Sequence, residues 1–419
     1  MLEINKVWNM DCIEGMKLLP DNSVDSIVTD PPYWLSFMGK KWDYDVPTQA
    51  IREECLRVLK PWGYLLAFAG TRTQHRMAVR IEDAWFEIRD MIAWVYGSWF
   101  PKSLNIGKAV DKLQGNEREQ TTNNVTCPDF PNPCNGHPTA NRSLGGGANR
   151  HALPTKGTSE WEGWGTALKP ALEPITVARK PLGEKTVAEN CLKWGVGGIN
   201  IDGCRVEAQK GDKFGGGGLN SPVNGFMGNT ENTYKKGTGF RDDTHIGRFP
   251  ANFIHDWSDE VVDLFPETKT NSSTHTPSNS NPRIEERWYR NQKASSWSAS
   301  RFFYVAKASK SDRNEWCEGL ESKFTKKMND WIWEREHNEN ESSAYNKNNH
   351  PTVKPTDLMR YLTRLVTRKW WLVLDPFTWS WSTWKACKLE WFDFIWFELD
   401  EWYCDIANKR LQYTQVWLF

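Results

Sequence analysis

An acid, two prolines and an aromatic residue stand together where an apolar run ends. Residues 23–30 read SVDSIVTD, and Asp30 is followed by Pro31, Pro32 and Tyr33. The apolar and β-branched residues predict a buried strand, which must stop at two prolines that cannot donate ladder hydrogen bonds. Open α/β sheets bind ligands at the carboxyl ends of their strands. Asp30 and Tyr33 are therefore candidate residues of a ligand-binding site.

A second candidate site lies near the other end of the chain. From Asp375 the sequence reads DPFTWSWSTW, between an expected strand and an expected helix. With glycine in place of Trp379, Trp381 and Trp384 it becomes DPFTGSGSTG, which has the G-x-G-x-x-G spacing of a loop that approaches a ligand closely. The next strand ends in an acid, Glu398, which could hold ribose hydroxyls. The combination predicts a nucleoside-cofactor site.

Strands and helices alternate around both motifs. We expect strands in residues 3–9, 23–30, 64–70, 86–96, 371–377 and 392–400, and helices in residues 13–19, 47–59, 73–84, 356–367 and 385–389. This alternation predicts an α/β fold with a doubly wound, mostly parallel sheet. From about residue 98 to residue 296 the chain is rich in Gly, Pro, Asn, Thr and Ser, with short expected strands at 175–178 and 198–206. We interpret this stretch as a large inserted middle region.

The composition is that of a globular protein of 419 residues with 53 basic and 53 acidic side chains. The net charge is zero, so any surface for nucleic acid must be local. Nine cysteines without a secretory leader predict a cytoplasmic location. No apolar run approaches the roughly 20 residues that span a bilayer, so we expect no membrane partner.

The motif order resembles the β group of DNA amino-methyltransferases, the DPPY family. In that group the DPPY half comes first, a variable region that reads the DNA comes second, and the cofactor loop comes last. The resemblance covers residues 1–100 and 297–415. It implies the S-adenosylmethionine-dependent methyltransferase fold in a circularly permuted motif order. Residues 1–97 would be the catalytic half, 98–296 the target-recognition region and 297–419 the cofactor-binding half.

The resemblance also assigns roles to residues, with S-adenosylmethionine as the cofactor and no metal. The catalytic set is Asp30, Pro31, Pro32 and Tyr33. The cofactor-binding set is Asp11, Cys12, His350, Lys354, Pro355, Asp375, Phe377, Trp379, Trp381 and Glu398. In the family, the acid at the position of Asp11 lies near the adenine of the cofactor. The segment that corresponds to HPTVKP closes over the methionine end, and the residues at the positions of Asp375 and Phe377 lie beside the cofactor.

The implied activity is site-specific methylation of an exocyclic amino group in double-stranded DNA, as in restriction-modification systems. The base is flipped out of the duplex, Asp30 and the carbonyl of Pro31 accept its amino hydrogens, and Tyr33 stacks on it. An aspartate at the first position favours adenine N6, with cytosine N4 as the alternative. A homodimer and a restriction endonuclease partner stay open, and the sequence does not give the recognition site.

Other interpretations are open. If the tryptophans are genuine, the chain would be a non-catalytic nucleic-acid-binding homologue that keeps the fold but has lost its cofactor. RNA and protein-glutamine methyltransferases carry related tetrapeptides, but the long middle region favours DNA. Mobile thiols are a better interpretation than zinc ligands for Cys127, Cys134 and His137, whose spacing is irregular. Phosphate contacts are a lesser candidate role for residues 37–42 and for Arg72, His75 and Arg76.

Tryptophan is abnormally frequent, with 25 Trp against 11 Tyr. Many stand where turn chemistry or the family pattern wants glycine: Trp34, Trp62, Trp85, Trp99, Trp257, Trp297, Trp370, Trp371, Trp379, Trp381, Trp384, Trp391, Trp396 and Trp402. Indoles in the cofactor loop would fill the ligand's space and disfavour backbone with positive φ. Our hypothesis is that the source reads UGA as glycine, whereas this chain is written with UGA as tryptophan.

The hypothesis predicts the codons. The gene should carry UGA at Trp379, Trp381 and Trp384, and UGG at tryptophans of ordinary type such as Trp42 and Trp94. Sequencing the gene checks this, and UGG at the three loop positions would refute it.

Overall fold

The computed structural model describes residues 2–34, 45–97, 103–120, 155–207, 247–270, 295–307, 353–377 and 382–401, with 312, 323–324, 345–346, 403–405 and 407–408. The chain divides into two compact units. The first is Met1–Val95, Glu173–Lys323 and Asn346–Phe419, and the second is Tyr96–Leu172 and Phe324–Tyr345. The described residues between 173 and 296 thus cluster with the first unit, and the role of residues 98–296 in target recognition stays a prediction.

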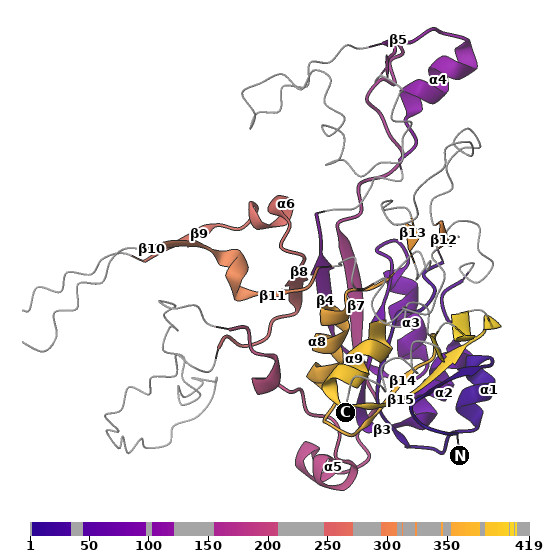
Figure 1. Cartoon of the computed structure of the whole chain (residues 1–419), viewed down its shortest axis with the longest axis vertical. Coiled ribbons are helices and arrows are strands. Elements are labelled where there is room, and N and C mark those ends of the chain that lie inside the picture. Colours follow the sequence, from indigo (N-terminus) through magenta and orange to yellow (C-terminus); the bar gives the residue numbers. More distant parts are fainter. Residues whose placement is uncertain are drawn as a thin grey trace, which may run out of the picture. The chain divides into compact units, whose positions relative to one another are not determined.

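In the described residues, nine strands form one sheet in the order β1-β15-β14-β2-β3-β7-β4-β8-β11 (Figure 1). Their bounds are β1 (Lys6–Asn9), β15 (Asp393–Glu398), β14 (Leu372–Asp375), β2 (Val24–Thr29), β3 (Leu59–Phe68), β7 (Leu172–Arg179), β4 (Glu87–Val95), β8 (Phe253–His255) and β11 (Tyr304–Val305). The neighbours from β1 to β3 are parallel, as are β4–β8 and β8–β11, whereas β7 is antiparallel to β3. The predicted mostly parallel sheet is confirmed.

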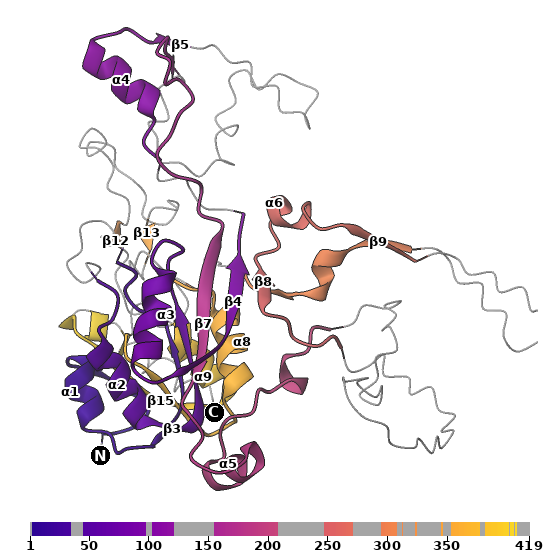
Figure 2. The ribbon, with the colours of Figure 1, turned by 180° about the vertical axis from the view of Figure 1, so that it is seen from behind.

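Helices cover both faces of this sheet (Figures 1 and 2). They are α1 (Cys12–Lys17), α2 (Gln49–Val58), α3 (Gln74–Asp83), α8 (Thr356–Val366) and α9 (Ser382–Glu390), whereas α5 (Val187–Trp194) lies below the ends of the strands in both views. Ile27 of β2 belongs to one apolar cluster with residues of α1, α2 and α3. Its neighbour Ser26 instead contacts Thr367, which follows α8, at 2.6 Å between hydroxyl oxygens. Because successive strand residues point to opposite faces, α8 lies on the other face, and the sheet is doubly wound.

The smaller elements complete the description. In the second unit, α4 (Ile106–Gln114) is followed by the antiparallel pair β5 (Glu119–Gln120) and β6 (Thr155–Lys156). The others are η3 (Asp202–Cys204), α6 (Asp259–Val262), β9 (Glu267–Thr270), β10 (Ser295–Ser298), η5 (Ala299–Phe302), β12 (Lys323–Phe324) and β13 (Tyr345–Asn346). Among the described residues, no helix is long and apolar enough to cross a membrane.

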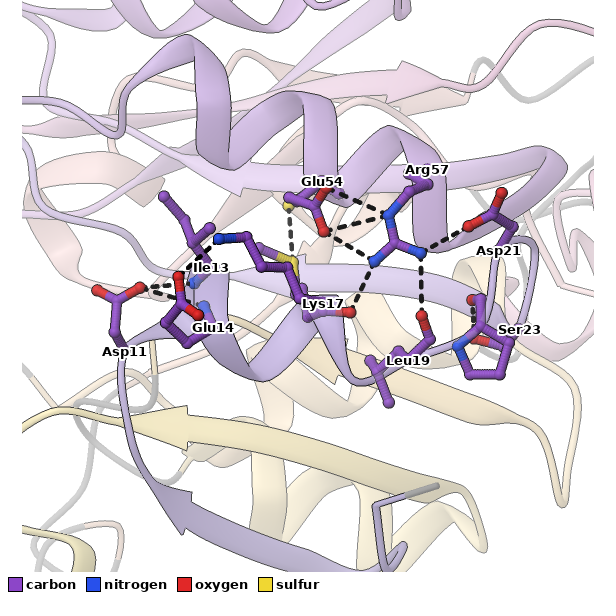
Figure 3. Close-up of polar contacts among 12 residues, drawn as sticks. Asp11, Ile13, Glu14, Lys17, Leu19, Asp21, Ser23, Glu54 and Arg57 are labelled. Carbon is purple, nitrogen blue, oxygen red and sulfur yellow. Dashed lines mark hydrogen bonds and ion pairs between the residues drawn. The ribbon is translucent and has the colours of Figure 1, made fainter.

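One arginine fixes the turn that leads into β2 (Figure 3). The guanidinium of Arg57, on α2, donates to the carboxylates of Glu54 at 2.7 Å and Asp21 at 2.6 Å. It also donates to the backbone carbonyls of Met16 at 2.7 Å and Leu19 at 2.9 Å, at the end of α1. The end of α1 and the following turn are thereby held against α2, and the start of β2 is fixed.

Two local expectations were wrong. Residues 198–206 form turns and η3 rather than a strand, because Asn200 donates its backbone N–H to the carbonyl of Leu365 and its side chain accepts from Gly203. Strand β3 begins at Leu59 and so includes Pro61, whereas we expected it to begin at residue 64. The register between β2 and β3 shifts between Val24 and Ser26, so the pairing is irregular in this first part of β3.

Six of the tryptophans that the structure describes have a left-handed backbone. Their φ angles are 58° at Trp34, 70° at Trp62, 70° at Trp85, 57° at Trp257, 67° at Trp370 and 64° at Trp391. The other described non-glycine residues with positive φ are Asn5 and Asn22, a residue type that tolerates this region. A Cβ in this region costs about 1–2 kcal/mol per residue. Six such positions together cost about as much as the net stability of a small domain.

Two of these tryptophans occupy the glycine position of a helix C-terminal motif. After α3, Trp85 donates its backbone N–H to the carbonyl of Glu82 at 2.8 Å, and Phe86 donates to Ile81 at 3.3 Å. These are the two hydrogen bonds of a Schellman motif, whose left-handed residue is usually glycine. Trp391 makes the same pattern after α9. Helices α4 and α5 end on left-handed glycines, which shows the residue type that the geometry favours.

The backbone predicts a stability gain at one of these positions. Trp85→Gly should raise the free energy of unfolding by about 1 kcal/mol, because the indole is 78% exposed and only the left-handed strain is removed. Urea denaturation measures this change.

Two control variants test the cause. Trp85→Ala keeps the Cβ and should gain little, whereas Trp94→Gly removes a buried indole and should lose about 3–5 kcal/mol. A Trp85→Gly variant no more stable than Trp85→Ala would contradict this account.

Candidate active site

The two predicted site segments meet at one edge of the sheet. Strands β2 and β14 are parallel neighbours, with Leu374 opposite Ile27. Asp30 follows the last residue of β2, and Asp375 is the last residue of β14. The hydroxyl of Thr29 donates to the Asp375 carboxylate at 2.6 Å, so the strand ends are joined by a buried hydrogen bond. The Asp30 end of β2 and the Asp375 end of β14 therefore lie side by side at one edge of the sheet.

Asp30 lies in a buried cluster of charged and polar groups. The Lys354 ammonium donates to its Oδ2 at 2.8 Å, and the Tyr33 hydroxyl donates to its Oδ1 at 2.5 Å. Glu173 completes the cluster, with Oε2 at 3.2 Å from both the Lys354 ammonium and the Tyr33 hydroxyl. Burial alone would lower the pKa of Lys354, but the two carboxylates outweigh it and raise this pKa above its usual value. Lys354 therefore stays charged and holds two acids from different strands.

The corner formed by Pro31, Pro32 and Tyr33 is held by a hydrogen bond from the residue before α3. Pro31 is buried, and Pro32 and Tyr33 are half-buried. The hydroxyl of Thr73, just before α3, donates to the backbone carbonyl of Tyr33 at 2.6 Å. Burial and the neighbouring carboxylates of Asp30 and Glu173 raise the pKa of Tyr33 well above its usual value, so its hydroxyl keeps its proton. The corner thus presents a neutral phenol beside an acid.

The cofactor-side acids lie at the ends of neighbouring strands. Asp375 accepts hydrogen bonds from Thr29, from Thr383 at 3.0 Å and from the backbone of Phe377 at 3.1 Å. Burial raises its pKa to about 7 against these hydrogen bonds. Glu398 ends β15 and is 9% exposed. Burial raises its pKa to about 8, against a hydrogen bond from the backbone of Asp400.

The remaining predicted residues have mixed positions. The Asp11 side chain caps α1 by accepting from the backbone of Ile13 at 2.8 Å (Figure 3), and Cys12 is buried beneath it. Pro355 is the N-cap of α8, directly after Lys354. The predicted residues outside the described parts of the chain are His350, Trp379 and Trp381. Trp384, the third indole of the loop motif, is 1% exposed on α9.

The lesser candidates add little. Residues 37–42, Cys127, Cys134 and His137 lie outside the described parts of the chain, and the rest contains no group of acids, histidines and cysteines that could hold a metal. Arg72, His75 and Arg76 are exposed, and the guanidinium of Arg76 lies 4.4 Å from the ring centre of Trp34. A phosphate-binding role for this exposed group stays a prediction.

Sequence reasoning missed Glu173. It is the acid that precedes the apolar run ITVA in β7. Because β7 is antiparallel to β3, with Ile175 opposite Phe68, the start of β7 lies at the edge where the parallel strands end. An acid at the start of an antiparallel strand thus reaches the same site as an acid at the end of a parallel one. Only the strand direction, which the sequence did not give, identifies it.

The sequence model of the DNA methylase family, N6_N4_Mtase, matches residues 24–121 and 234–409. These segments make up more than half of the chain, and both site segments lie within them. The chain belongs to this family, whose name covers N6 and N4 methylases. This family agrees with the DNA amino-methyltransferases that the motif order of the sequence resembles.

Individual relatives are more distant. Type II methyltransferase M.HinfI of Haemophilus influenzae is 27% identical over 22% of this chain and 31% of its own length. Type II methyltransferase M.HindIII of the same organism is 24% identical over 47% of this chain and 65% of its own length. The matches thus span less than two thirds of these relatives. The crystal structure of the M1.HpyAVI–SAM complex is 14% identical, with a TM-score of 0.39 over 97% of this chain and 98% of that one.

The buried acids predict how stability depends on pH. Asp375 and Glu398 keep their protons in the folded state at pH values where the unfolded chain has lost them. The folded state therefore binds more protons, and stability should fall as pH rises from about 4 to 8, by up to about 1.4 kcal/mol per pH unit for each group.

Urea denaturation at several pH values between 5 and 8 measures this fall. The double variant Asp375→Asn, Glu398→Gln should show a shallower dependence than the parent protein. Equal slopes for the two proteins would mean that these carboxyls do not hold their protons in the folded state.

Proposed function

We propose that this protein transfers a methyl group from S-adenosylmethionine to an exocyclic amino group in double-stranded DNA, adenine N6 first and cytosine N4 second. The observation that carries the proposal is the position of Asp30, an acid at the end of β2 that lies beside the Asp375 end of β14. A hydrogen-bond acceptor and a nucleoside-cofactor edge are thus adjacent. Family membership supports the same reaction.

The acceptors would act on the amino nitrogen. An exocyclic amino group is conjugated with its ring and is a poor nucleophile. The Asp30 carboxylate would accept one amino hydrogen and the carbonyl of Pro31 the other, which draws the lone pair out of conjugation. Both acceptors are fixed before the substrate arrives, one by Lys354 and Tyr33 and one by the proline backbone, so little reorganisation is needed.

The residues present fit the cofactor in their donor and acceptor chemistry. The pKa of Glu398 is raised by burial, so a ribose hydroxyl that donates to this carboxyl would compensate its desolvation. Asp375 fixes the backbone of Phe377 at the start of the loop. When bound, S-adenosylmethionine supplies an electrophilic methyl group. We propose that Asp11, Cys12, Phe377 and Glu398, with the 379–384 loop and the 350–355 segment, surround it.

The active form should carry glycine in the cofactor loop. The left-handed backbone at Trp34, Trp85 and Trp391 supports glycine at the other predicted positions as well. Trp396 points the same way, since its indole N–H is buried without a hydrogen-bond partner among the described residues. Such an orphaned donor costs about 1–3 kcal/mol. We therefore propose that the chain as written is less stable and less active than its glycine-bearing form.

Base choice and partners follow from less direct arguments. Aspartate at the first position of the tetrapeptide favours adenine N6, and the family includes both chemistries in its name. We propose the middle region, residues 98–296, as the part that reads the target sequence. A cytoplasmic location fits a reaction on DNA. A homodimer and a restriction endonuclease partner stay predictions of the family resemblance.

Methyl transfer tests the proposal. The form with glycine at all fourteen predicted positions is incubated with labelled S-adenosylmethionine and duplex DNA of mixed sequence, and the digested nucleosides are separated by mass spectrometry. We expect N6-methyladenine. The variant Asp30→Asn should lower kcat by about 100-fold or more, because it removes a preset acceptor.

Two controls complete this experiment. Asp83→Asn, at the end of α3, should retain full activity. N4-methylcytosine as the product would correct the base while keeping the reaction. Binding of S-adenosylmethionine without methyl transfer to any duplex would overturn the proposal in favour of a non-catalytic homologue.

A further inference from the structure

Three charged side chains from distant parts of the chain share one buried site. Asp30 follows β2, Glu173 is the second residue of β7, and Lys354 precedes α8, 324 residues after Asp30. Their side chains are 10%, 14% and 5% exposed. Burying charges is costly unless each is paired, so this set is held together by its mutual contacts.

The lysine is shared rather than given to one acid. The Lys354 ammonium lies 2.8 Å from Asp30 and 3.2 Å from Glu173. It also lies over the rings of Tyr33 and Phe68, at 5.3 and 5.1 Å from their centres, which adds cation–π attraction. With two acids and one base, the cluster carries one net negative charge. Glu173 therefore competes with Asp30 for the Lys354 ammonium, which would otherwise pair with Asp30 alone.

The hydroxyl of Tyr33 is likewise shared between Asp30 and Glu173. The Tyr33 hydroxyl has one hydrogen, which it donates to Asp30 at 2.5 Å, while its oxygen lies 3.2 Å from Glu173. Each oxygen of Asp30 thus accepts one hydrogen bond and has a second lone-pair direction. A target amino hydrogen needs one of these directions. The orientation of Asp30 toward a substrate therefore depends on where Glu173 holds Lys354 and Tyr33.

We propose that Glu173 is a positioning residue for methyl transfer, which shares Lys354 and Tyr33 with Asp30 and so keeps Asp30 oriented and basic enough to accept an amino hydrogen. The inference rests on the proposed methyl transfer. Glu173 acts through Lys354 and Tyr33 and does not itself touch the base. Without its charge, Lys354 pairs with Asp30 alone, and this acceptor becomes weaker.

The test is the variant Glu173→Gln in the glycine-bearing protein. Glutamine keeps the size and an acceptor oxygen but removes the charge. We expect kcat to fall roughly 10- to 100-fold, in the range of other preset polar groups, with the KM for S-adenosylmethionine within about twofold. Calorimetry without DNA should give an unchanged affinity for this cofactor.

The pH profile separates positioning from a purely structural role. Among the described residues, charged and titratable groups that contact Asp30, lie beside its partners or interact with it electrostatically are Lys354, Tyr33, Glu173 and Asp375. Loss of one negative charge makes protonation of the cluster less favourable, so the acid limb of kcat should move down by roughly one pH unit. A structural role would lower the melting temperature but leave this limb in place.

Matched variants fix the interpretation. Glu184→Gln breaks another glutamate–lysine pair, with Lys193, and should leave kcat and the profile unchanged. Glu173→Asp keeps the charge on a shorter side chain and should recover part of the lost rate, also if Glu173→Gln folds poorly. An active reference whose Glu173→Gln variant matches Glu184→Gln overturns the inference alone. An inactive reference overturns the proposed function and the inference with it.

Discussion

The active edge depends on one buried ammonium between two carboxylates. Lys354 belongs to the segment before α8, yet its partners are Asp30, which follows β2, and Glu173, near the start of β7. An unpaired ammonium in this place would be strongly disfavoured, and so would two unpaired carboxylates. Removing any one of the three side chains from this cluster would therefore leave a buried charge with fewer partners. The contact between Lys354 and Asp30 joins two segments that are 324 residues apart in the sequence. It lies at the edge of the sheet where we propose that methyl transfer takes place.

The rest of the edge follows from strand order. Because β14 lies next to β2, and β15 next to β14, the acids Asp30, Asp375 and Glu398 end three neighbouring parallel strands. Thr29 joins the first two through a hydrogen bond. The acids differ in their surroundings. Asp30 has a cation beside it, whereas burial raises the pKa values of the other two. One edge thus offers an acid paired with a cation and two buried carboxyls that hold their protons more tightly than usual.

Much of this was predictable from local sequence. The DPPY corner, the strand ending in Asp375 and the alternation of strands and helices gave the fold and most of the edge, because each depends on a short pattern. Glu173 was missed because its position depends on the antiparallel direction of β7, a long-range property. The segment 198–206 was misread because Asn200 hydrogen-bonds to the end of α8. The tryptophans at left-handed positions could be recognised from the sequence as standing at glycine positions, because turn chemistry there calls for a residue without a Cβ. The structure gives these tryptophans a positive φ.

The central claim is that Lys354 and Asp30 form a coupled buried pair that joins the two halves of the chain. A double-mutant cycle on unfolding free energy, with Asp30→Asn, Lys354→Met and the double variant, measures this coupling directly. The account predicts that Lys354→Met costs about 3–5 kcal/mol, because it leaves the carboxylates of Asp30 and Glu173 buried without their cation. The same change should cost less when Asp30 is already Asn, because then only Glu173 loses its partner. Additive effects within about 0.5 kcal/mol would show that the two side chains do not interact and would contradict the account.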